Sequence, residues 1–225
     1  MAAGASEGTT HEPPLQCMVT STAGVDPFAG ELSCSTYLDV EWDSPQIQTR
    51  IVNDTDQPIV VTNWTIGCGQ PSRRFDFVGT MGGRAMAAGA SVCADNWDAC
   101  ASYAEGADGC LLCGTLYPDI YIAPGGWFSE PWDAWLKGAV VMPGVCVDHA
   151  DDLPCFAAVP LAAGTFTATA HAMLVDLEDS ACRCQPDEFG SCAIEGGCNF
   201  VETSTASAVH DGVCETLEIV FAAGA

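Results

Sequence analysis

The sequence predicts an all-β fold, an antiparallel β-sandwich with disulfide-stapled loop insertions, and two stretches carry this prediction. In residues 161–174, a turn that contains Gly164 precedes a segment in which Phe and Ala alternate with Thr and His. Successive residues of a strand face opposite sides of a sheet, so Phe166 and the three alanines that alternate after it are expected to face the core. In residues 46–66, two apolar segments flank the polar turn 53–58 and are expected to form paired strands.

Shorter strands are expected elsewhere along the chain, separated by turns rich in Gly and Pro. They are expected at residues 37–42, 73–78, 116–122 and 214–221. The last of these is expected to pair with the central strand 165–174 in a long-loop hairpin, whereas the Gly-rich residues 79–93 are expected to form a surface loop. Bulky side chains must face the alanines of the central strand, and Trp64, Ile51 and Ile219 are the candidates.

One domain accounts for most of the chain. Residues 17–225 are predicted to form a single β-sandwich domain, with cysteine-rich insertions at about 79–115 and 178–212. Residues 1–16 carry a pair of prolines and no periodicity, which predicts a flexible N-terminal leader. This leader lacks both the charged and the apolar regions of a signal peptide.

Fourteen cysteines are the strongest compositional feature of the chain. An even number spread along the sequence is typical of an oxidising compartment, so we predict an extracellular, cell-surface or periplasmic location and expect every cysteine in a disulfide. The sequence leaves the pairing open, although proximity suggests a Cys17–Cys34 bridge. The set consists of Cys17, Cys34, Cys68, Cys93, Cys100, Cys110, Cys113, Cys146, Cys155, Cys182, Cys184, Cys192, Cys198 and Cys214.

Thirty acidic residues against six basic ones give the chain a net charge of −24. Such a field repels phosphate backbones and anionic lipid headgroups, so nucleic-acid partners and binding to a membrane surface are not expected. No apolar run approaches the roughly 18 residues that span a bilayer, so direct membrane insertion is not expected either. Solubility in a salty or extracellular medium is the favoured explanation for the charge, and cation binding by clustered carboxylates is the alternative.

Calcium is the best of the metal hypotheses, although no cofactor is predicted. Asp148, Asp151 and Asp152 lie within five residues of one another, in an expected loop between two cysteines. Hard cations prefer clustered oxygen ligands, but this stretch lacks the EF-hand pattern with its central glycine.

Sulfur chemistry offers three further alternatives. Cys110 and Cys113 have the spacing of a redox dithiol without its βαβ context, which favours a structural disulfide. The zinc candidates are Cys182, Cys184, Cys192 and Cys198. The copper candidates are Cys146, His149, His171 and Met173. Neither set fits its metal, because the first lacks the repeated cysteine pairs of zinc sites and the second does not follow one late loop as blue-copper ligands do.

The chain carries no catalytic motif, so an enzyme is not predicted. The four histidines are His11, His149, His171 and His210. None belongs to a nucleophile elbow or a zinc-protease helix, and the chain has no phosphate-binding loop. Glu41 and Asp43 flank Trp42 in a pattern that a glycosidase uses, but an acidic surface strand has the same pattern.

Three tryptophans suggest a site for carbohydrate. Trp127, Trp132 and Trp135 could together form an aromatic platform, whereas packing in the core and between sheets is the favoured explanation for them. Asn53 and Asn63 begin N-glycosylation sequons, but the second lies in a predicted buried strand, which favours chance matches.

The order of several motifs along the chain carries a resemblance to a known family. The motifs are Val-Asn-Asp-Thr-Asp-Gln-Pro at 52–58, Ile-Ala-Pro-Gly-Gly at 122–126, a Trp-bearing segment after it, and Pro-Leu-Ala-Ala-Gly-Thr-Phe-Thr at 160–167. This order resembles immunoglobulin-like domains of the bacterial intracellular-proteinase-inhibitor type, over about residues 46–66 and 116–175. The resemblance implies an immunoglobulin-like sandwich and an inhibitory role. The cysteine-rich insertions depart from it, and Phe166 lacks the hydroxyl of a tyrosine corner.

These observations together predict a non-enzymatic, exported or cell-surface module for binding or assembly. Its expected partners are a protein or a glycan at the cell surface, with self-association as a further option. The alternative is an exported proteinase inhibitor that presents a disulfide-braced loop. The second alternative is a calcium- or glycan-binding domain.

Overall fold

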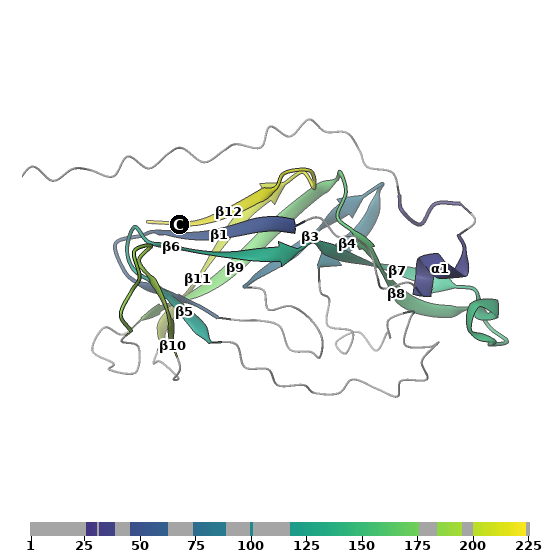
Figure 1. The fold of residues 1–225 in the computed structure, drawn as a ribbon, viewed down its shortest axis with the longest axis horizontal. Helices are drawn as coiled ribbons and strands as arrows, with labels where there is room; N and C mark the ends of the chain where they lie inside the picture. Colours follow the sequence, from purple (N-terminus) through teal and green to yellow (C-terminus); the bar gives the residue numbers. More distant parts are fainter. Residues whose placement is uncertain are drawn as a thin grey trace, which may run out of the picture.

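The chain folds as an all-β protein, which confirms the predicted fold class. The computed structural model describes residues 26–30, 32–38, 46–62, 74–88, 100, 118–175, 184–194 and 200–223. Its strands are β1 (Gln46–Asp54), β2 (Ile59–Val61), β3 (Phe75–Met81), β4 (Arg84–Ala88), β5 (Asp119–Ile122), β6 (Trp127–Asp133), β7 (Trp135–Met142), β8 (Leu153–Pro160), β9 (Thr165–Val175), β10 (Ser191–Ile194), β11 (Phe200–His210) and β12 (Thr216–Ala222) (Figure 1). The helices are α1 (Cys34–Leu38) and the 3-10 helix η1 (Gly144–Val147). Within this part of the chain, no helix has the length and apolar character that crossing a bilayer requires.

The smaller sheet has three strands in the order β12-β1-β6. β1 runs parallel to β12 and antiparallel to β6, with Ile51 between Ile219 and Phe128. The C-terminal strand therefore completes the sheet beside the first strand (Figure 1). The expectation that residues 214–221 pair with the central strand is wrong, because β11 occupies that edge of β9.

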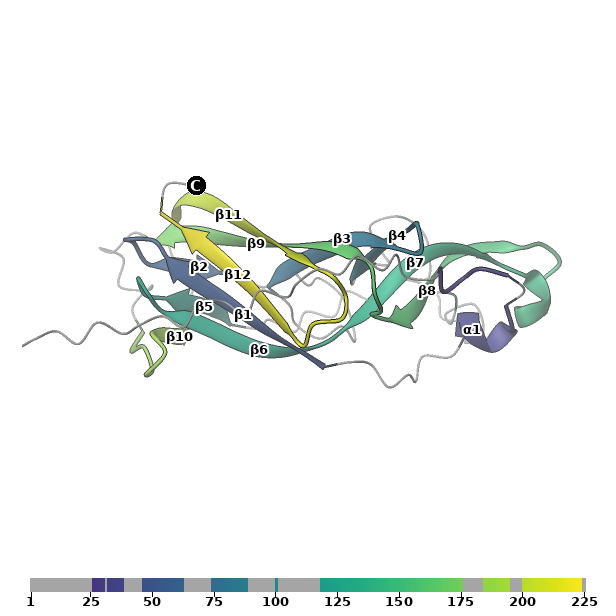
Figure 2. The same ribbon diagram turned by 90° about the horizontal axis from the view of Figure 1, so that it is seen from above.

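The larger sheet has nine strands and is organised around β9. β2 and β3 follow one another along one edge of β9, and β11 lies along the other edge. The sheet consequently divides into two branches, β2-β5-β10 and β3-β4-β7-β8. Figure 2 shows the two branches extending toward opposite ends of the molecule.

The predicted pairing of the two strands in residues 46–66 is wrong, since β1 and β2 belong to different sheets. The polar turn between them is held by Asn53, whose Nδ2 donates to the carbonyl oxygens of Gln57 (2.8 Å) and Ile122 (3.0 Å). The Oδ1 of Asn53 accepts the backbone N–H of Thr55 at 3.1 Å. Because Asn53 is fully buried, the first sequon is not accessible in the folded protein.

The predicted register of the central strand agrees with the structure. Phe166, Ala168, Ala170 and Ala172 are at most 1% exposed. The ring of Phe166 stacks on Phe77 with centroids 5.0 Å apart. Two of the residues expected opposite the alanines, Ile51 and Ile219, belong to this core, and Trp64 lies outside the described residues.

Two segments that were expected to be loops contain strands. Gly82 and Gly83, with φ of 59° and 82°, form a two-residue turn that joins β3 to β4. Glycine tolerates positive φ, so the Gly-rich stretch marks a hairpin here. The second predicted insertion, at residues 178–212, contains β10 and β11. Conversely, the strand expected at 37–42 overlaps the last two residues of α1, and residues 39–45 lie outside the described part.

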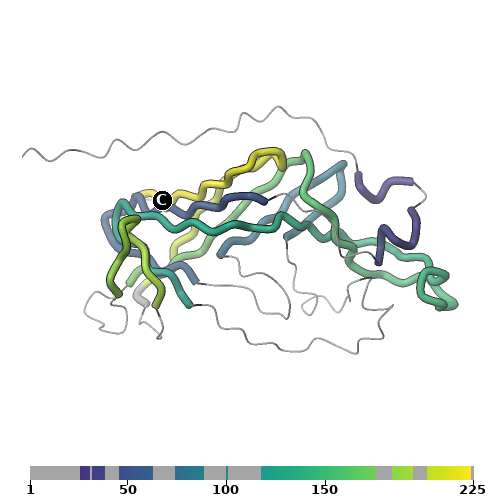
Figure 3. The backbone as a smooth tube through the Cα atoms, in the orientation of Figure 1, coloured from purple at the N-terminus to yellow at the C-terminus, as the bar shows by residue number. Residues whose placement is uncertain are grey.

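A hairpin of β7 and β8 projects from the sandwich, and together with η1 and α1 we call it the arm. β6 and β7 follow one another around the buried Ala134, so the chain leaves the smaller sheet and enters the larger one (Figure 3). β7 meets β4 at the pair Ala87–Lys137 and pairs with β8 from Trp135 to Met142. The rest of the two sheets is called the sandwich body.

Candidate ligand groove

All cysteines in the described part of the chain are in disulfides. The bonds join Cys34 to Cys146, Cys100 to Cys155 and Cys184 to Cys192, and Cys214 is also disulfide-bonded. The expected Cys17–Cys34 bridge is wrong, because Cys34 bonds to the tip of the arm. These disulfides indicate an oxidising environment. The cysteines outside the described residues are Cys17, Cys68, Cys93, Cys110, Cys113, Cys182 and Cys198.

The zinc and copper candidates are not brought together as ligands. Cys184 and Cys192 form one disulfide and Cys146 belongs to another, so none of the three offers a thiolate. His171 lies on the outer side of β9, with its Nε2 3.7 Å from a carboxylate oxygen of Asp76.

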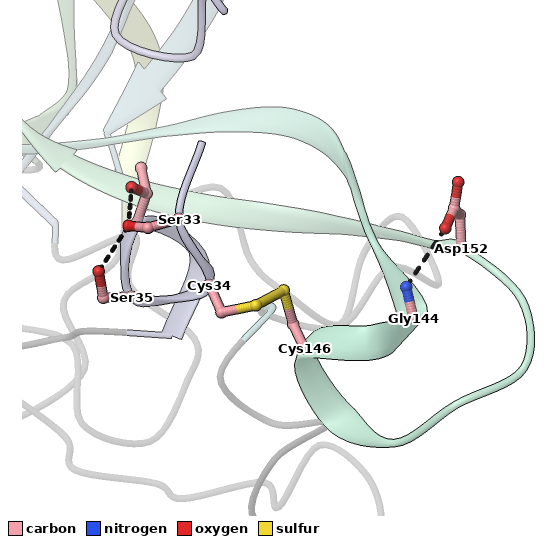
Figure 4. The surroundings of a disulfide bond; sticks show 7 residues. Ser33, Cys34, Ser35, Gly144, Cys146 and Asp152 are labelled. Atoms are coloured by element: carbon pink, nitrogen blue, oxygen red, sulfur yellow. Dashed lines mark hydrogen bonds between the residues drawn. A yellow bond between two sulfur atoms is a disulfide. The ribbon is translucent and has the colours of Figure 1, made fainter. Parts of the chain in front are cut away.

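The calcium candidates lie in the exposed loop at the tip of the arm. Asp152 accepts the backbone N–H of Gly144 at 3.2 Å and thereby holds the start of η1 (Figure 4). Asp148 ends that helix in the left-handed conformation, with φ of 55°. Within the described residues, no three side chains of the types His, Cys, Asp and Glu gather as a metal site would require, Asp151 included.

The three tryptophans do not form a single platform. Trp132 is buried in the core, where its ring centroid lies 5.3 Å from that of Phe75 and 4.9 Å from that of Phe77. Trp127, at the other end of β6, is half-buried, and Trp135 begins β7. The packing explanation therefore holds for Trp132, and Trp127 remains as an aromatic side chain at the surface.

A groove of about 650 Å³ runs beside β6, and we call it the β6 groove. Its walls include Gln48 from β1, Ile120 from β5, Trp127, Phe128 and Ser129 from β6, and Asp187 and Phe189 from the segment before β10. The centroids of the Trp127 and Phe189 rings are 4.4 Å apart. An aromatic wall and a few polar groups are typical of ligand sites.

Short-range bonds fix the segment that carries Phe189. The disulfide between Cys184 and Cys192 closes it at both ends. Within it, Asp187 Oδ1 accepts the backbone N–H groups of Phe189 (2.9 Å) and Ser191 (3.0 Å). The carbonyl of Phe189 accepts the N–H of Trp127 at 2.9 Å. The groove wall is therefore held covalently and by hydrogen bonds before any ligand binds.

Sequence reasoning missed Phe189 as a site residue. The signal available was an Asp-Glu-Phe-Gly turn enclosed by two cysteines, inside a region treated as an insertion. The contact with Trp127 joins residues far apart in the chain, so local patterns do not reveal it. Gln48, Ser129 and Asp187 were missed for the same reason.

Electrostatics around the groove come from a few groups. Arg50 lies over the ring of Trp127, 4.3 Å from its centroid, and its Nη1 is 3.6 Å from Glu218. Behind Phe128, the nearly buried Arg74 pairs with Glu130 and lies 4.9 Å from the Phe128 ring. Burial raises the pKa of Glu130, and the charge of Arg74 opposes that shift.

Both of these arginines already have acidic partners. Asp187 is the one charged side chain among the described residues that line the groove. The groove is therefore weakly acidic.

The histidines in the described part are spread over the molecule. His149 lies in the exposed loop of the arm, where its Nδ1 is hydrogen-bonded to the backbone of Asp151. His171 lies on the outer side of β9, and His210 is buried against Phe77. They share no site with one another or with the groove, and His11, Glu41 and Asp43 lie outside the described residues.

Comparison of the chain with protein-family models, curated proteins and solved structures found no match. The resemblance to immunoglobulin-like domains of the proteinase-inhibitor type thus stays a prediction.

Proposed function

We propose that the chain is a non-enzymatic, exported or cell-surface binding module, and that the β6 groove is the site at which its partner binds. The observation that carries the proposal is the pre-formed aromatic wall of Trp127 and Phe189, fixed by the Cys184–Cys192 disulfide beside an open groove. A site that is rigid before binding loses less conformational entropy on binding, which supports affinity.

The exported location rests on the disulfides and on the charge. Disulfides persist outside the reducing cytosol, and the described cysteines are all bonded. A net charge of −24 keeps such a chain soluble and disfavours nucleic acid and anionic lipid as partners. A protein or a glycan is the partner class that remains.

The inhibitor alternative has one observation in its favour, because the loop at the tip of the arm is braced by the Cys34–Cys146 disulfide and exposes Val145 by 84%. However, Val145 lies within η1, and a substrate-like loop has to be extended to fit a protease cleft. The β6 groove needs no such rearrangement. We therefore place the binding site in the groove.

A pair of tryptophan variants tests the groove. The purified chain is offered a glycan array and a phage-displayed library of random linear peptides, and bound probes are then titrated with each variant. Trp127→Ala should weaken binding by about 2 kcal/mol or more, as expected for a central aromatic anchor. Trp135→Ala, a tryptophan outside the groove lining, is the matched control and should bind as the wild type does. Binding to neither probe, or equal binding by both variants, would contradict the proposal.

A further inference from the structure

The polar side chains of the β6 groove are already hydrogen-bonded within the protein. The hydroxyl of Ser129 donates to the carbonyl of Thr49 at 2.7 Å and accepts from Nε2 of Gln48 at 2.5 Å. Asp187 Oδ1 accepts the two backbone N–H groups of its own turn, and the hydroxyl of Ser191 lies 3.5 Å from it. A sugar that relied on these side chains for its hydroxyls would have to break existing bonds.

The backbone of β6 is different, because alternate residues of an edge strand point their N–H and C=O groups away from the sheet. Asn53 donates its backbone N–H to the carbonyl of Gly126, so the carbonyl of Gly126 points toward β1. Trp127 donates its backbone N–H to the carbonyl of Phe189, so the N–H of Trp127 points away from β1. By alternation, both backbone groups of Ser129 point away from β1, on the side of the groove that Ser129 lines.

The free part of this edge is short and has defined ends. At one end, the carbonyl of Phe189 accepts the N–H of Trp127, as a neighbouring strand would. At the other end, Pro131 has no N–H to offer, and proline is tolerated at such an outward position. Between them, β1 is the only strand that pairs with β6 among the described residues, so the N–H and C=O of Ser129, which point away from β1, have no ladder partner there. The unpaired backbone groups of Ser129 therefore lie at the groove.

Resting on the function proposed above, we propose that the ligand of the β6 groove is an extended polypeptide segment of a partner protein, which adds to the edge of β6 as a short strand. Main-chain hydrogen bonds to Ser129 supply the pairing, and side-chain pockets supply specificity, as in other cases of strand addition. One apolar side chain of the segment packs against Trp127 and Phe189. Asp187 and the net charge of −24 select a neutral or basic segment over an acidic one.

The decisive variant removes a single N–H group from the edge. Ser129→Pro deletes the outward N–H, and Pro131, two residues along the same edge, shows that the strand accommodates proline there. Ser129→Ala is the matched variant, since it loses the hydroxyl and keeps the N–H. A peptide selected from the library on the wild type should bind Ser129→Pro about tenfold more weakly, the effect of one lost hydrogen bond, and should bind Ser129→Ala at least several-fold more tightly than it binds Ser129→Pro.

A second measurement removes the hydrogen bonds that the ligand donates, such as the one from a ligand N–H to the carbonyl of Ser129, and it needs no variant that might misfold. Each amide of the selected peptide is N-methylated in turn and its affinity for the wild-type chain is measured by calorimetry. A strand added to β6 should be sensitive at alternate amides only, because only alternate groups face the edge.

The outcomes separate the two proposals. A glycan that loses affinity with Trp127→Ala and binds Ser129→Pro normally would leave the groove as the binding site and overturn the peptide ligand. Uniform insensitivity of the peptide to N-methylation would overturn it as well. Self-association of the wild type that Ser129→Pro abolishes would show that the edge pairs with a second copy of the chain, and would also overturn it. If neither glycans nor peptides bind, the proposed function fails together with the inference.

Discussion

The sandwich body and the arm are stabilised in different ways. In the body, β9 is paired along both edges, and its inner face is filled by aromatic rings such as Phe77, Phe166 and Trp132. In the arm, two strands carry smaller buried side chains such as Leu136 and Ala157. An isolated two-stranded hairpin is marginally stable in water, so the arm needs support that the body obtains from a second sheet.

Disulfides supply that support. The Cys100–Cys155 bond has both cysteines fully buried within the core and attaches β8 to it. The Cys34–Cys146 bond ties α1 to the tip of the arm (Figure 4). The third described bond, Cys184–Cys192, likewise holds a segment at the periphery of the sheet. Two of these three bonds therefore lie at the periphery of the fold, and the third is buried in the core.

The largest effect is expected in the body. Phe166→Ala should lower the free energy of unfolding by about 3–5 kcal/mol, because it removes the ring that stacks on Phe77 and leaves a cavity between fully buried neighbours. Thr169→Ala is the matched control on the other face of the same strand, where its hydroxyl meets Ser207 at 2.9 Å, and it should cost under about 1 kcal/mol. Urea unfolding followed by circular dichroism measures both changes. Equal costs for the two variants would contradict the packing assigned to β9.

A smaller and more local effect is expected in the arm. Replacing both Cys34 and Cys146 by Ser should lower the free energy of unfolding by about 2 kcal/mol. This is at the lower end for a lost disulfide, because Cys100–Cys155 still anchors β8. Amide hydrogen exchange should accelerate in α1 and η1 and stay unchanged in β9, since local openings follow local contacts. Faster exchange throughout β9 would show instead that arm and body unfold as one unit.

The sequence predicted the buried face of a strand better than it predicted strand pairing. Alternation identified the inner face of β9, because one buried face imposes a period of two on its residues. Strand pairing was harder to predict. The strand at residues 46–54 pairs with the C-terminal strand in parallel, whereas proximity in the chain favoured the adjacent strand, which is at 59–61 in the structure. Nothing local specifies that choice, which depends on how both sheets bury their faces.

Local sequence patterns could not predict the groove either, because its walls come from segments far apart in the chain. Trp127 was one of three candidates for an aromatic platform, with core packing favoured for all three, and its partner Phe189 lies 62 residues further along the chain in a segment that was predicted to be an insertion. The relevant backbone groups of Ser129 carry no sequence signature, because any residue has them. They become a feature only once β6 is known to be an edge strand.

The smallest effect concerns pH and the turn that links the two sheets of the body. His210 ends β11 and is 2% exposed. Its Nδ1 accepts the N–H of Gly212 at 2.9 Å and its Nε2 donates to the carbonyl of Cys214 at 3.1 Å, so the ring is held neutral with both nitrogens used. Burial lowers the pKa of His210, and the nearby charge of Asp211 opposes that shift only in part.

Because the folded pKa of His210 lies below the unfolded value of about 6.5, the unfolded chain binds more protons as the pH falls. The contribution of His210 to stability is therefore complete above about pH 6.5 and is lost as the pH falls through the folded pKa. Protonation of Nδ1 would also deprive the N–H of Gly212 of its acceptor. His210→Gln does not titrate, so the stability difference between wild type and this variant should shrink on acidification. Urea melts across the pH range measure this difference, and a constant wild-type advantage over His210→Gln would show that the turn is insensitive to the proton.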